Sequence, residues 1–398
     1  MRILLINDYA VPSYGSENQV LALRDALIQK GHDARIFAGR VGPGGKRGGL
    51  ADYHCRGTRS HLQTLVKVAN LWAFVKLRQV LGEFRPQVVH VRMFLPQLSP
   101  LILPLLKNIP TLYLAAAHTS ICPMGNKLLP DGTLCEQIAG TVCYRRGCLP
   151  LRSWLPQMIE LKLFQHWKDA FDMIIANSRA LQSQLACGGL QSDAVLWNFV
   201  SWRKQRPPLT APPTAVFAGR LIHEKGADIL VKAFQSVRRA LPDARLIIAG
   251  DGPQRVHLQK LISTMALNYA VTLTGHLTRD RLEALFDRAW VQVVPGRWAE
   301  PFGNVAAEAL MRGTAVIASA SGAMPEIIAD GQSGLLVPPG DVHHLAQKMT
   351  ELLADRKLAE EMGRRARIAA LKHFSQETYL DTLLAIYQTI RCKYRYSH

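Results

Sequence analysis

Short apolar runs alternate with longer segments of helical periodicity along most of the 398-residue chain. The apolar runs are rich in Val, Ile, Leu and Ala, which is typical of buried strands. Strands that alternate with helices favour parallel sheets covered by helices on both faces. The predicted strands are residues 1–7, 34–38, 87–91, 111–117, 173–176 and 195–197, and then a second series that begins at residue 215 and continues at 246–249, 271–274, 291–294, 315–318 and 335–337.

A stretch with four prolines, residues 203–213, separates the two series and is typical of a linker. The length of the chain also favours two hydrophobic cores. We therefore predict an α/β protein of two doubly wound, Rossmann-like domains that face each other across a cleft. Its parts are an N-terminal domain of residues 1–206, a linker of residues 207–213 and a C-terminal domain of residues 214–374. Ligands bind such sheets beyond the carboxyl ends of their strands.

The string EPFGNVAAE, which runs from Glu300 to Glu308, follows one of the predicted strands. Phe302 and Gly303 form a turn, and a helix is predicted from Asn304 onward. Backbone N–H groups at a helix N-terminus suit a diphosphate, and carboxylates accept hydrogen bonds from sugar hydroxyls. Without their neighbours in the sequence, two solvated glutamates would be the better interpretation.

The flanking segments 318–328 and 330–338 change that interpretation. Together with EPFGNVAAE they resemble family 4 of the retaining glycosyltransferases, whose signature is two glutamates separated by seven residues. The resemblance extends to residues 217–221 with 224–226, to 250–253 and to 15–18, and it covers nearly the whole chain. It implies the GT-B fold, a nucleotide-sugar donor, retention of configuration, and a last helix that returns residues 375–398 to the first domain.

Arg220 and Lys225 flank the turn after the first strand of the second domain. Fixed cations there can stabilise the negative charge that builds on a departing diphosphate. The resemblance assigns both to the donor diphosphate, whereas two solvated loop cations would be the interpretation without it. No Asp-x-Asp triplet occurs in the sequence, so we expect catalysis without a metal ion and no required cofactor.

We expect two loops to supply further donor contacts. Gly15 lies after the first strand and allows close approach of the diphosphate, and Gly250 lies in a loop expected to surround the nucleoside. His118 ends a predicted strand, and the resemblance implies that it contacts the donor sugar near the reacting carbon. Many members of the family have aspartate next, where this chain has Thr119. The predicted site has Glu300 and His118 as catalytic residues, and Gly15, Arg220, Lys225, Gly250, Phe302, Gly303, Asn304 and Glu308 as donor-binding residues.

The formal charge of +18 is concentrated in the first half of the chain. Residues 1–206 contain 25 Lys and Arg against 12 Asp and Glu, a net charge of +13. This excess favours an anionic acceptor or an anionic membrane surface, with a simple solubility surplus as the alternative. Nucleic acid is not expected, because no nucleic-acid-binding motif occurs and only 7% of the residues are aromatic.

Residues 62–85 predict a helix that could lie on anionic lipid, although its periodicity is better explained by an ordinary core-facing helix. The apolar start is too short for a signal peptide, and prolines and a lysine break the stretch 98–117. We expect a cytoplasmic protein that can bind peripherally to the inner face of the membrane.

Four of the seven cysteines lie close together, namely Cys122, Cys135, Cys143 and Cys148. The odd total and the expected cytoplasmic setting disfavour a disulfide framework. Four thiolates could form a structural zinc site, but their intervals match no common zinc finger, and reduced thiols in a packed insertion are the preferred alternative.

The sequence thus predicts a retaining glycosyltransferase that moves a sugar from a UDP- or GDP-linked donor to a glycan or lipid-linked acceptor of a cell-surface polysaccharide or glycolipid. A nucleotide-sugar epimerase of the same fold and a non-catalytic sugar-nucleotide-binding module are the alternatives. No motif identifies the base, the sugar or the acceptor.

Overall fold

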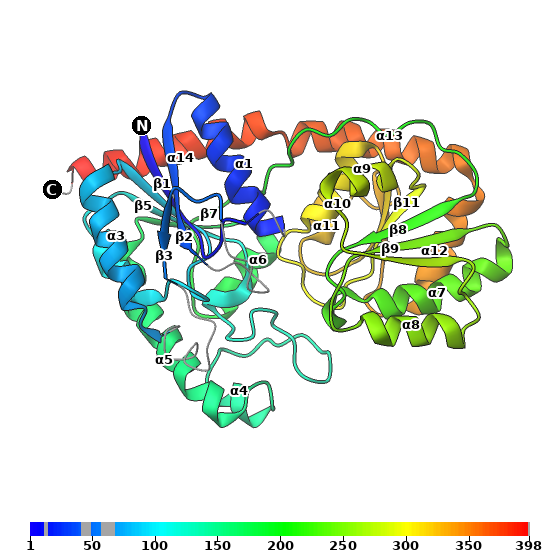
Figure 1. Ribbon diagram of the computed structural model, residues 1–398, viewed down its shortest axis with the longest axis horizontal. Helices are drawn as coiled ribbons and strands as arrows, with labels where there is room; N and C mark the ends of the chain where they lie inside the picture. Colours follow the sequence, from blue (N-terminus) through cyan, green and yellow to red (C-terminus); the bar gives the residue numbers. More distant parts are fainter. Residues whose placement is uncertain (12–14, 41–48, 57–67, 397–398) are drawn as a thin grey trace. The chain divides into compact units, whose positions relative to one another are not determined.

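The computed structural model describes residues 1–11, 15–40, 49–56 and 68–396 (Figure 1). The chain forms two compact units. Unit 1 contains Met1–Asn198 and Gln376–His398, and unit 2 contains Phe199–Ser375. The proline-rich segment 207–213 belongs to unit 2, where Leu209 is buried in the core and its N–H donates to Glu360 at 2.9 Å.

Unit 1 is built on a parallel sheet with the strand order β3-β2-β1-β4-β5-β6-β7. Its strands are β1 (Arg2–Ile6), β2 (Asp33–Gly39), β3 (Tyr53–Cys55), β4 (Val88–Val91), β5 (Thr111–Ala115), β6 (Met173–Ala176) and β7 (Ala194–Val195). All but β3 correspond to predicted strands. β3 has only three residues, and half-buried Tyr53 and His54 make up most of it, so it lacks the apolar run of its neighbours.

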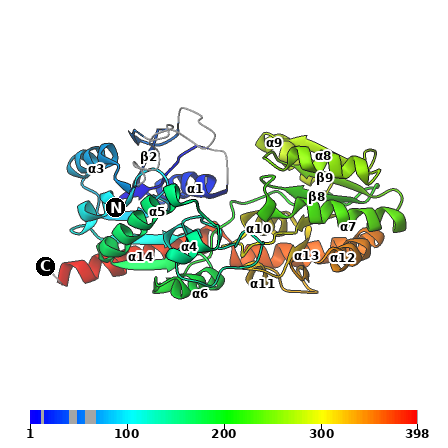
Figure 2. The same cartoon turned by 90° about the horizontal axis from the view of Figure 1, so that it is seen from below.

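The helices of unit 1 cover its sheet and end with the C-terminal helix. They are α1 (Gly15–Gln29), α3 (Leu71–Phe84), η2 (Pro100–Leu106), η3 (His118–Ser120), α4 (Thr141–Arg145), α5 (Leu151–Trp167), η4 (Lys168–Ala170), α6 (Arg179–Cys187) and α14 (Gln376–Tyr396). Figures 1 and 2 both show α14, in red, alongside unit 1. Leu383, Tyr387 and Ile390 form its fully buried stripe, and the Tyr387 hydroxyl lies 2.7 Å from His90 Nδ1. α14 is therefore fastened to β4.

Unit 2 repeats this architecture with the strand order β10-β9-β8-β11-β12-β13. Its strands are β8 (Thr214–Ala218), β9 (Arg245–Ala249), β10 (Val271–Gly275), β11 (Val291–Val294), β12 (Ala315–Ser319) and β13 (Gly334–Val337), all paired in parallel. Its helices are η5 (His223–Lys225), α7 (Ala227–Ala240), α8 (Arg255–Thr264), α9 (Arg279–Phe286), α10 (Asn304–Arg312), α11 (Met324–Ile327), α12 (Val342–Ala354) and α13 (Arg356–His373).

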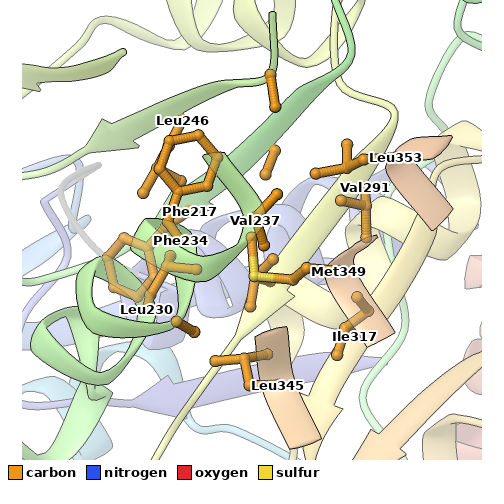
Figure 3. Packing of buried hydrophobic residues seen from close by; sticks show 14 of the residues in the cluster. Phe217, Leu230, Phe234, Val237, Leu246, Val291, Ile317, Leu345, Met349 and Leu353 are labelled. Atoms are coloured by element: carbon orange, nitrogen blue, oxygen red, sulfur yellow. The ribbon is translucent and has the colours of Figure 1, made fainter. Parts of the chain in front are cut away.

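The core of unit 2 lies between its sheet and helices α7 and α12 (Figure 3). Phe234 and Val237 of α7 and Met349 of α12 meet Val291 and Ile317 of the sheet, and all five are at most 1% exposed. Burial of each such side chain contributes about 1.5–3 kcal/mol. This packing gives the loops at the carboxyl ends of the strands a rigid base.

In both sheets the strand order reverses beside the first strand of the unit, between β1 and β4 and between β8 and β11. Loops that follow strands on opposite sides of such a point diverge and leave room for a ligand. Among the helices within the described ranges, none combines the length and apolar character needed to cross a bilayer.

Candidate functional site

Lys225 and Glu300 form an ion pair in unit 2, in the loops that follow β8 and β11, where the strand order reverses. Lys225 Nζ lies 2.6 Å from Glu300 Oε2, and the two side chains are only 19% and 15% exposed. The indole N–H of Trp298 donates to the same carboxylate oxygen at 2.8 Å, and Lys225 Nζ lies 5.0 Å from the centroid of the indole ring. The structure therefore brings together two of the predicted site residues, in a partly buried setting that strengthens electrostatic interactions.

The loop after β8 lies against the loop after β11, and this contact places Lys225 beside Glu300. Gly226 has φ +68°, and a Cβ there would lie 1.9 Å from the Pro295 carbonyl oxygen. Arg297 donates two hydrogen bonds to Asp228, at 2.7 and 2.6 Å. Burial alone would raise the pKa of Asp228, but the hydrogen bonds and the charge of Arg297 outweigh it and lower that pKa. A close backbone contact and a bidentate ion pair thus hold the two loops together.

The segment 318–328 packs against the backbone of Glu300. Ala323 N–H donates to the Glu300 carbonyl at 2.9 Å. Gly322 has φ +59°, and a Cβ there would lie 2.3 Å from the Glu300 carbonyl oxygen and 2.4 Å from its backbone nitrogen. Only glycine allows this approach without displacing the backbone of Glu300.

Gly250 lies in the loop after β9, against the turn that carries Arg220. Its φ is +149°, and a Cβ would lie 1.8 Å from the Gly219 carbonyl oxygen. Its N–H donates to the Gly275 carbonyl at 2.9 Å. Arg220 follows Gly219 directly and is exposed. The loops after β8, β9 and β10 are therefore in contact at one edge of the sheet.

The turn before α10 has the predicted form, with Gly303 at φ +97° and Asn304 as the first helical residue. Gly303, at the N-cap position, has no side chain that could cap this helix N-terminus. The Phe302 side chain, in contrast, is 2% exposed and packs edge-to-face on Phe374, with the ring centroids 5.8 Å apart. The Phe302 ring supports the turn from inside the core. The predicted donor contact of this residue would therefore come from its backbone.

Glu308 has a cation partner of its own. Arg203 Nη2 lies 3.1 Å from Glu308 Oε1, and Arg203 Nε lies 3.4 Å from Glu283. Glu283 also accepts two hydrogen bonds from Arg312, at 2.7 and 2.6 Å. Burial lowers the pKa of Arg203, while Glu308 acts in the opposite direction. The sequence interpretation missed Arg203 because the prolines after it indicated a linker.

In unit 1, Gly15 and His118 each begin a helix at the carboxyl edge of the sheet. Gly15 is the first residue of α1 and is exposed. His118 is the first residue of η3, three positions after the end of β5, and is 1% exposed. Its carbonyl accepts the N–H groups of Ile121 and Cys122 at 3.0 and 2.8 Å, which ties it to the start of the cysteine-bearing segment. The side chain of Ser16 lies outside the described part of the structure.

Two buried charged residues at the same edge were not predicted. Asp8, after β1, is fully buried and accepts the N–H groups of Gln97 and Leu98 at 2.7 and 3.2 Å. Burial and then the charge of Asp8 raise the pKa of Tyr9 to about 12. Arg92, after β4, is 2% exposed and donates to Asn198 at 3.3 Å. The available signal was position, because each lies within two residues of the end of a strand.

The four neighbouring cysteines are free thiols. Cys122 and Cys143 are buried, and Cys135 and Cys148 are half-buried. Burial raises the pKa of Cys143 and Cys148, and the charges of the other cysteines of the cluster raise it further. Within the described ranges, no three His, Cys, Asp or Glu side chains are arranged to hold a metal ion. The structural zinc stays a prediction.

Each unit has a Rossmann-type sheet whose strand order reverses beside its first strand, which is where ligands bind in such sheets. Two units of this kind are typical of two-domain proteins that bind nucleotides. Sucrose-phosphate synthase from Thermosynechococcus elongatus has this fold, with a TM-score of 0.75 and 21% identity over 98% of this chain and 99% of that one. HepE from Anabaena, solved in complex with UDP and glucose, gives a TM-score of 0.66 and 18% identity over 97% and 99% of the two chains. The fold is GT-B, as predicted.

The family models for "Glycosyltransferase Family 4" and "Glycosyl transferases group 1" match residues 14–201 and 199–369. The chain belongs to glycosyltransferase family 4, which confirms the resemblance seen in its motifs.

The curated relatives match about half of the chain. Glycogen synthase from Mycobacterium tuberculosis is 34% identical over 195 residues, which are 49% of this chain and 46% of that protein. The GDP-mannose-dependent alpha-(1-6)-phosphatidylinositol monomannoside mannosyltransferase of the same species is 37% identical over 166 residues, 40% of this chain and 43% of that one. Alpha-D-kanosaminyltransferase from Streptomyces kanamyceticus is 30% identical over 187 residues, 47% and 48% of the two chains. The chain thus spans less than half the length of each of these relatives.

Proposed function

We propose that this protein transfers a hexosyl group from a nucleotide-diphosphate sugar to a hydroxyl group of a glycan or lipid-linked acceptor. The transfer retains the configuration of the anomeric carbon and uses no metal ion. The observation that supports this proposal most directly is the Lys225–Glu300 pair, which places a cation for a diphosphate next to a carboxylate for sugar hydroxyls.

The chemistry follows from the charges at this site. As the bond between the anomeric carbon and the diphosphate oxygen breaks, negative charge builds on the diphosphate, and Lys225 and Arg220 stabilise it. The acceptor oxygen forms its bond to the anomeric carbon on the same face, and its proton passes to an oxygen of the departing diphosphate. No protein acid is needed, because a diphosphate is a good leaving group.

Glu300 has a second role in this proposal. The diphosphate of the donor competes for Lys225, and the Glu300 carboxylate then accepts hydrogen bonds from the hydroxyls of the bound sugar. Glu308 is assigned to the ribose and His118 to the sugar near the reacting carbon. Support for Glu308 comes from its separate partner, Arg203, which holds it apart from the Lys225–Glu300 pair.

The donor is a UDP- or GDP-linked hexose. One solved structure of similar fold contains UDP and glucose, and one relative is named for GDP-mannose, so the comparisons support both bases. The acceptor belongs to a cell-surface polysaccharide or glycolipid, which the net charge of +13 on residues 1–206 supports.

A thermal-shift panel of UDP-glucose, UDP-N-acetylglucosamine and GDP-mannose tests donor binding. A donor present at about 100 times its Kd stabilises the folded protein by about 2.7 kcal/mol. Lys225→Met should abolish the shift. The matched control is Lys348→Met, which removes a lysine whose carboxylate partner, Glu351, lies on the surface of α12. No shift with any donor would contradict the proposal.

Product analysis separates the proposal from its two alternatives. A transferase releases nucleotide diphosphate in proportion to the glycosylated acceptor. An epimerase changes the sugar nucleotide when the donor is supplied alone. A sugar-nucleotide-binding module shows donor binding without turnover on any acceptor.

A further inference from the structure

Helix α5 of unit 1 exposes an apolar stripe. Leu151, Leu155 and Ile159 are 57%, 55% and 42% exposed and follow one another at a spacing of four residues. Side chains at this spacing lie on the same face of a helix. The opposite face is occupied, because Glu160 and Phe164 are buried and α5 packs on η2. The stripe is therefore an outward face that the core of unit 1 leaves uncovered.

Helix α4 adds aromatic side chains to this face. Tyr144 is 48% exposed, and its ring lies 6.3 Å from the ring of Trp154 on α5. Trp154 is half-buried and donates to the Gly140 carbonyl at 2.8 Å, which fastens the segment before α4 to α5. Tyr and Trp suit a membrane–water interface because they combine an apolar ring with a polar group.

The exposed charges that α4 and α5 themselves carry have one sign, although exposed Asp131, from the segment before them, lies near Arg146. Between Thr141 and Trp167 the only acidic residue is Glu160, which is 7% exposed. The same stretch carries four exposed cations, namely Arg145, Arg146, Arg152 and Lys162. Exposed apolar side chains bordered by cations match the surface of an anionic bilayer, where the side chains enter the interface and the cations meet lipid phosphates.

We propose that the α4–α5 face, defined as Tyr144, Leu151, Leu155 and Ile159 with these four cations, docks this protein onto an anionic lipid bilayer. A second copy of the chain fits this face poorly, since a symmetric pair would set the four cations against four like charges. The docking proposal names a membrane partner for the proposed transferase, but it does not depend on the transfer reaction.

Flotation with lipid vesicles tests the docking. Wild-type protein should float with vesicles of phosphatidylcholine mixed equally with phosphatidylglycerol and remain unbound with phosphatidylcholine alone. Replacing Leu151, Leu155 and Ile159 together by Ser should lower the bound fraction at least about tenfold. Replacing Arg145, Arg146 and Arg152 together by Glu should remove the preference for anionic vesicles. The affinity for these vesicles should fall by about fivefold for each residue replaced.

Matched controls come from unit 2. Ile368 and Leu371 on α13 are 60% and 43% exposed, so Ile368→Ser with Leu371→Ser removes similar exposed apolar area elsewhere. Arg239→Glu reverses an exposed charge on α7. Both controls should float like wild type, and every variant should keep the donor-induced thermal shift.

Three results would overturn the docking proposal. The first is that wild type binds equally and negligibly to both kinds of vesicle. The second is that the α4–α5 variants bind like wild type. The third is that the protein forms a concentration-dependent dimer that the Ser variant abolishes. Failure of the transferase proposal gives a different result, namely loss of the donor response with flotation intact.

Discussion

Three cations near the candidate site of unit 2 and those of the α4–α5 face of unit 1 are arranged in opposite ways. In unit 2, Lys225 is paired with Glu300, Arg203 with Glu308 and Arg297 with Asp228. These six side chains are 11–31% exposed. On the α4–α5 face the cations are exposed, and the segment 141–167 that carries them has one acidic residue, Glu160, which is buried. Exposed Asp131, outside this segment, lies near Arg146 but forms no ion pair with it within 4 Å among the described residues.

The difference separates two kinds of anion binding. A partly buried cation with a carboxylate partner stays compensated until one small anion of defined shape replaces that partner. Exposed cations around an apolar stripe suit an extended surface whose negative charges have no fixed position. The two proposals thus assign different kinds of ligand to the two units, a discrete donor to unit 2 and a lipid surface to unit 1.

The largest expected effect concerns the carboxylates of unit 2. Glu300→Gln keeps the size of the side chain but removes the charge, and we expect kcat to fall about 100- to 1,000-fold. The affinity for free nucleoside diphosphate should change little, because Lys225 remains. Steady-state kinetics and calorimetry with UDP and GDP measure the two quantities.

Glu308→Gln is the matched comparison, because it should weaken nucleotide binding more than it lowers kcat. Asp243→Asn, at an exposed position of unit 2, controls for loss of a surface charge. Full turnover by Glu300→Gln together with tight donor binding would remove Glu300 from the essential residues.

The next largest effect tests the contact between the two loops of unit 2. Gly226→Ala should destabilise unit 2 by about 2–4 kcal/mol, because its Cβ meets a backbone carbonyl oxygen and its φ is left-handed. Gly331→Ala is a close control, with φ +71° against +68° and no atom within 4 Å of the position that its Cβ would take. Chemical denaturation measures both. Equal destabilisation would show that the φ alone matters and that the close approach to Pro295 does not.

Most strands could be predicted because a buried parallel strand is apolar on both faces. β11, for example, has four buried residues, three of them Val, and its bounds are those predicted from the sequence. The contact between Lys225 and Glu300 could not be derived from the sequence pattern alone, since 75 positions separate them. It depends on the order of the sheet, in which β8 pairs directly with β11. The family motifs supplied the residues, and the topology brought them together.

Other parts of the site could not be predicted for equally specific reasons. The ring of Phe302 is buried against Phe374, a residue 72 positions later that no local pattern links to it. The helix predicted at 62–85 is described from Leu71 onward as α3, which buries Ala73, Leu77, Val80 and Phe84. α3 therefore has a core face, but its Leu71, Trp72 and Val75 are 66%, 50% and 66% exposed, so the membrane-surface alternative stays a prediction. Residues 62–67 lie outside the described structure. The exposed stripe of α5 was missed because its apolar residues resemble a core face in sequence.

A smaller effect should appear in the pH dependence of the two units. Burial, and then the charge of Arg92, lower the pKa of His90 well below its usual value. Below pH 6.5 the unfolded chain therefore binds a proton that folded unit 1 excludes, and stability falls by up to about 1.4 kcal/mol per pH unit. The lowered pKa of Asp228 affects stability in a different pH range. The stabilisation that it gives to unit 2 is present above about pH 3.8 and is lost only below that value.

Thermal unfolding followed between pH 7.5 and 5.5 measures this difference. His90→Gln, which can still hydrogen-bond to the Tyr387 hydroxyl, should flatten the pH dependence of Tm. Arg297→Met removes the partner of Asp228 and should lower Tm equally at both pH values. An unchanged slope in His90→Gln would remove His90 as the source of the acid sensitivity.

The smallest expected effect on the donor site comes from the four-cysteine cluster of unit 1. If the cluster binds structural zinc, purified protein contains about one equivalent of metal, which Cys143→Ser and Cys148→Ser remove and exposed Cys187→Ser retains. Chelation should lower donor affinity only slightly, because Lys225, Glu300 and Glu308 and their partners all lie in unit 2, whereas the cluster is linked to the proposed donor contacts through His118, whose carbonyl accepts the Cys122 N–H. Less than about a tenth of an equivalent of zinc would reject the metal site and leave reduced, packed thiols as the explanation. The raised pKa values of Cys143 and Cys148 agree with this alternative, because they disfavour the thiolate in the metal-free protein.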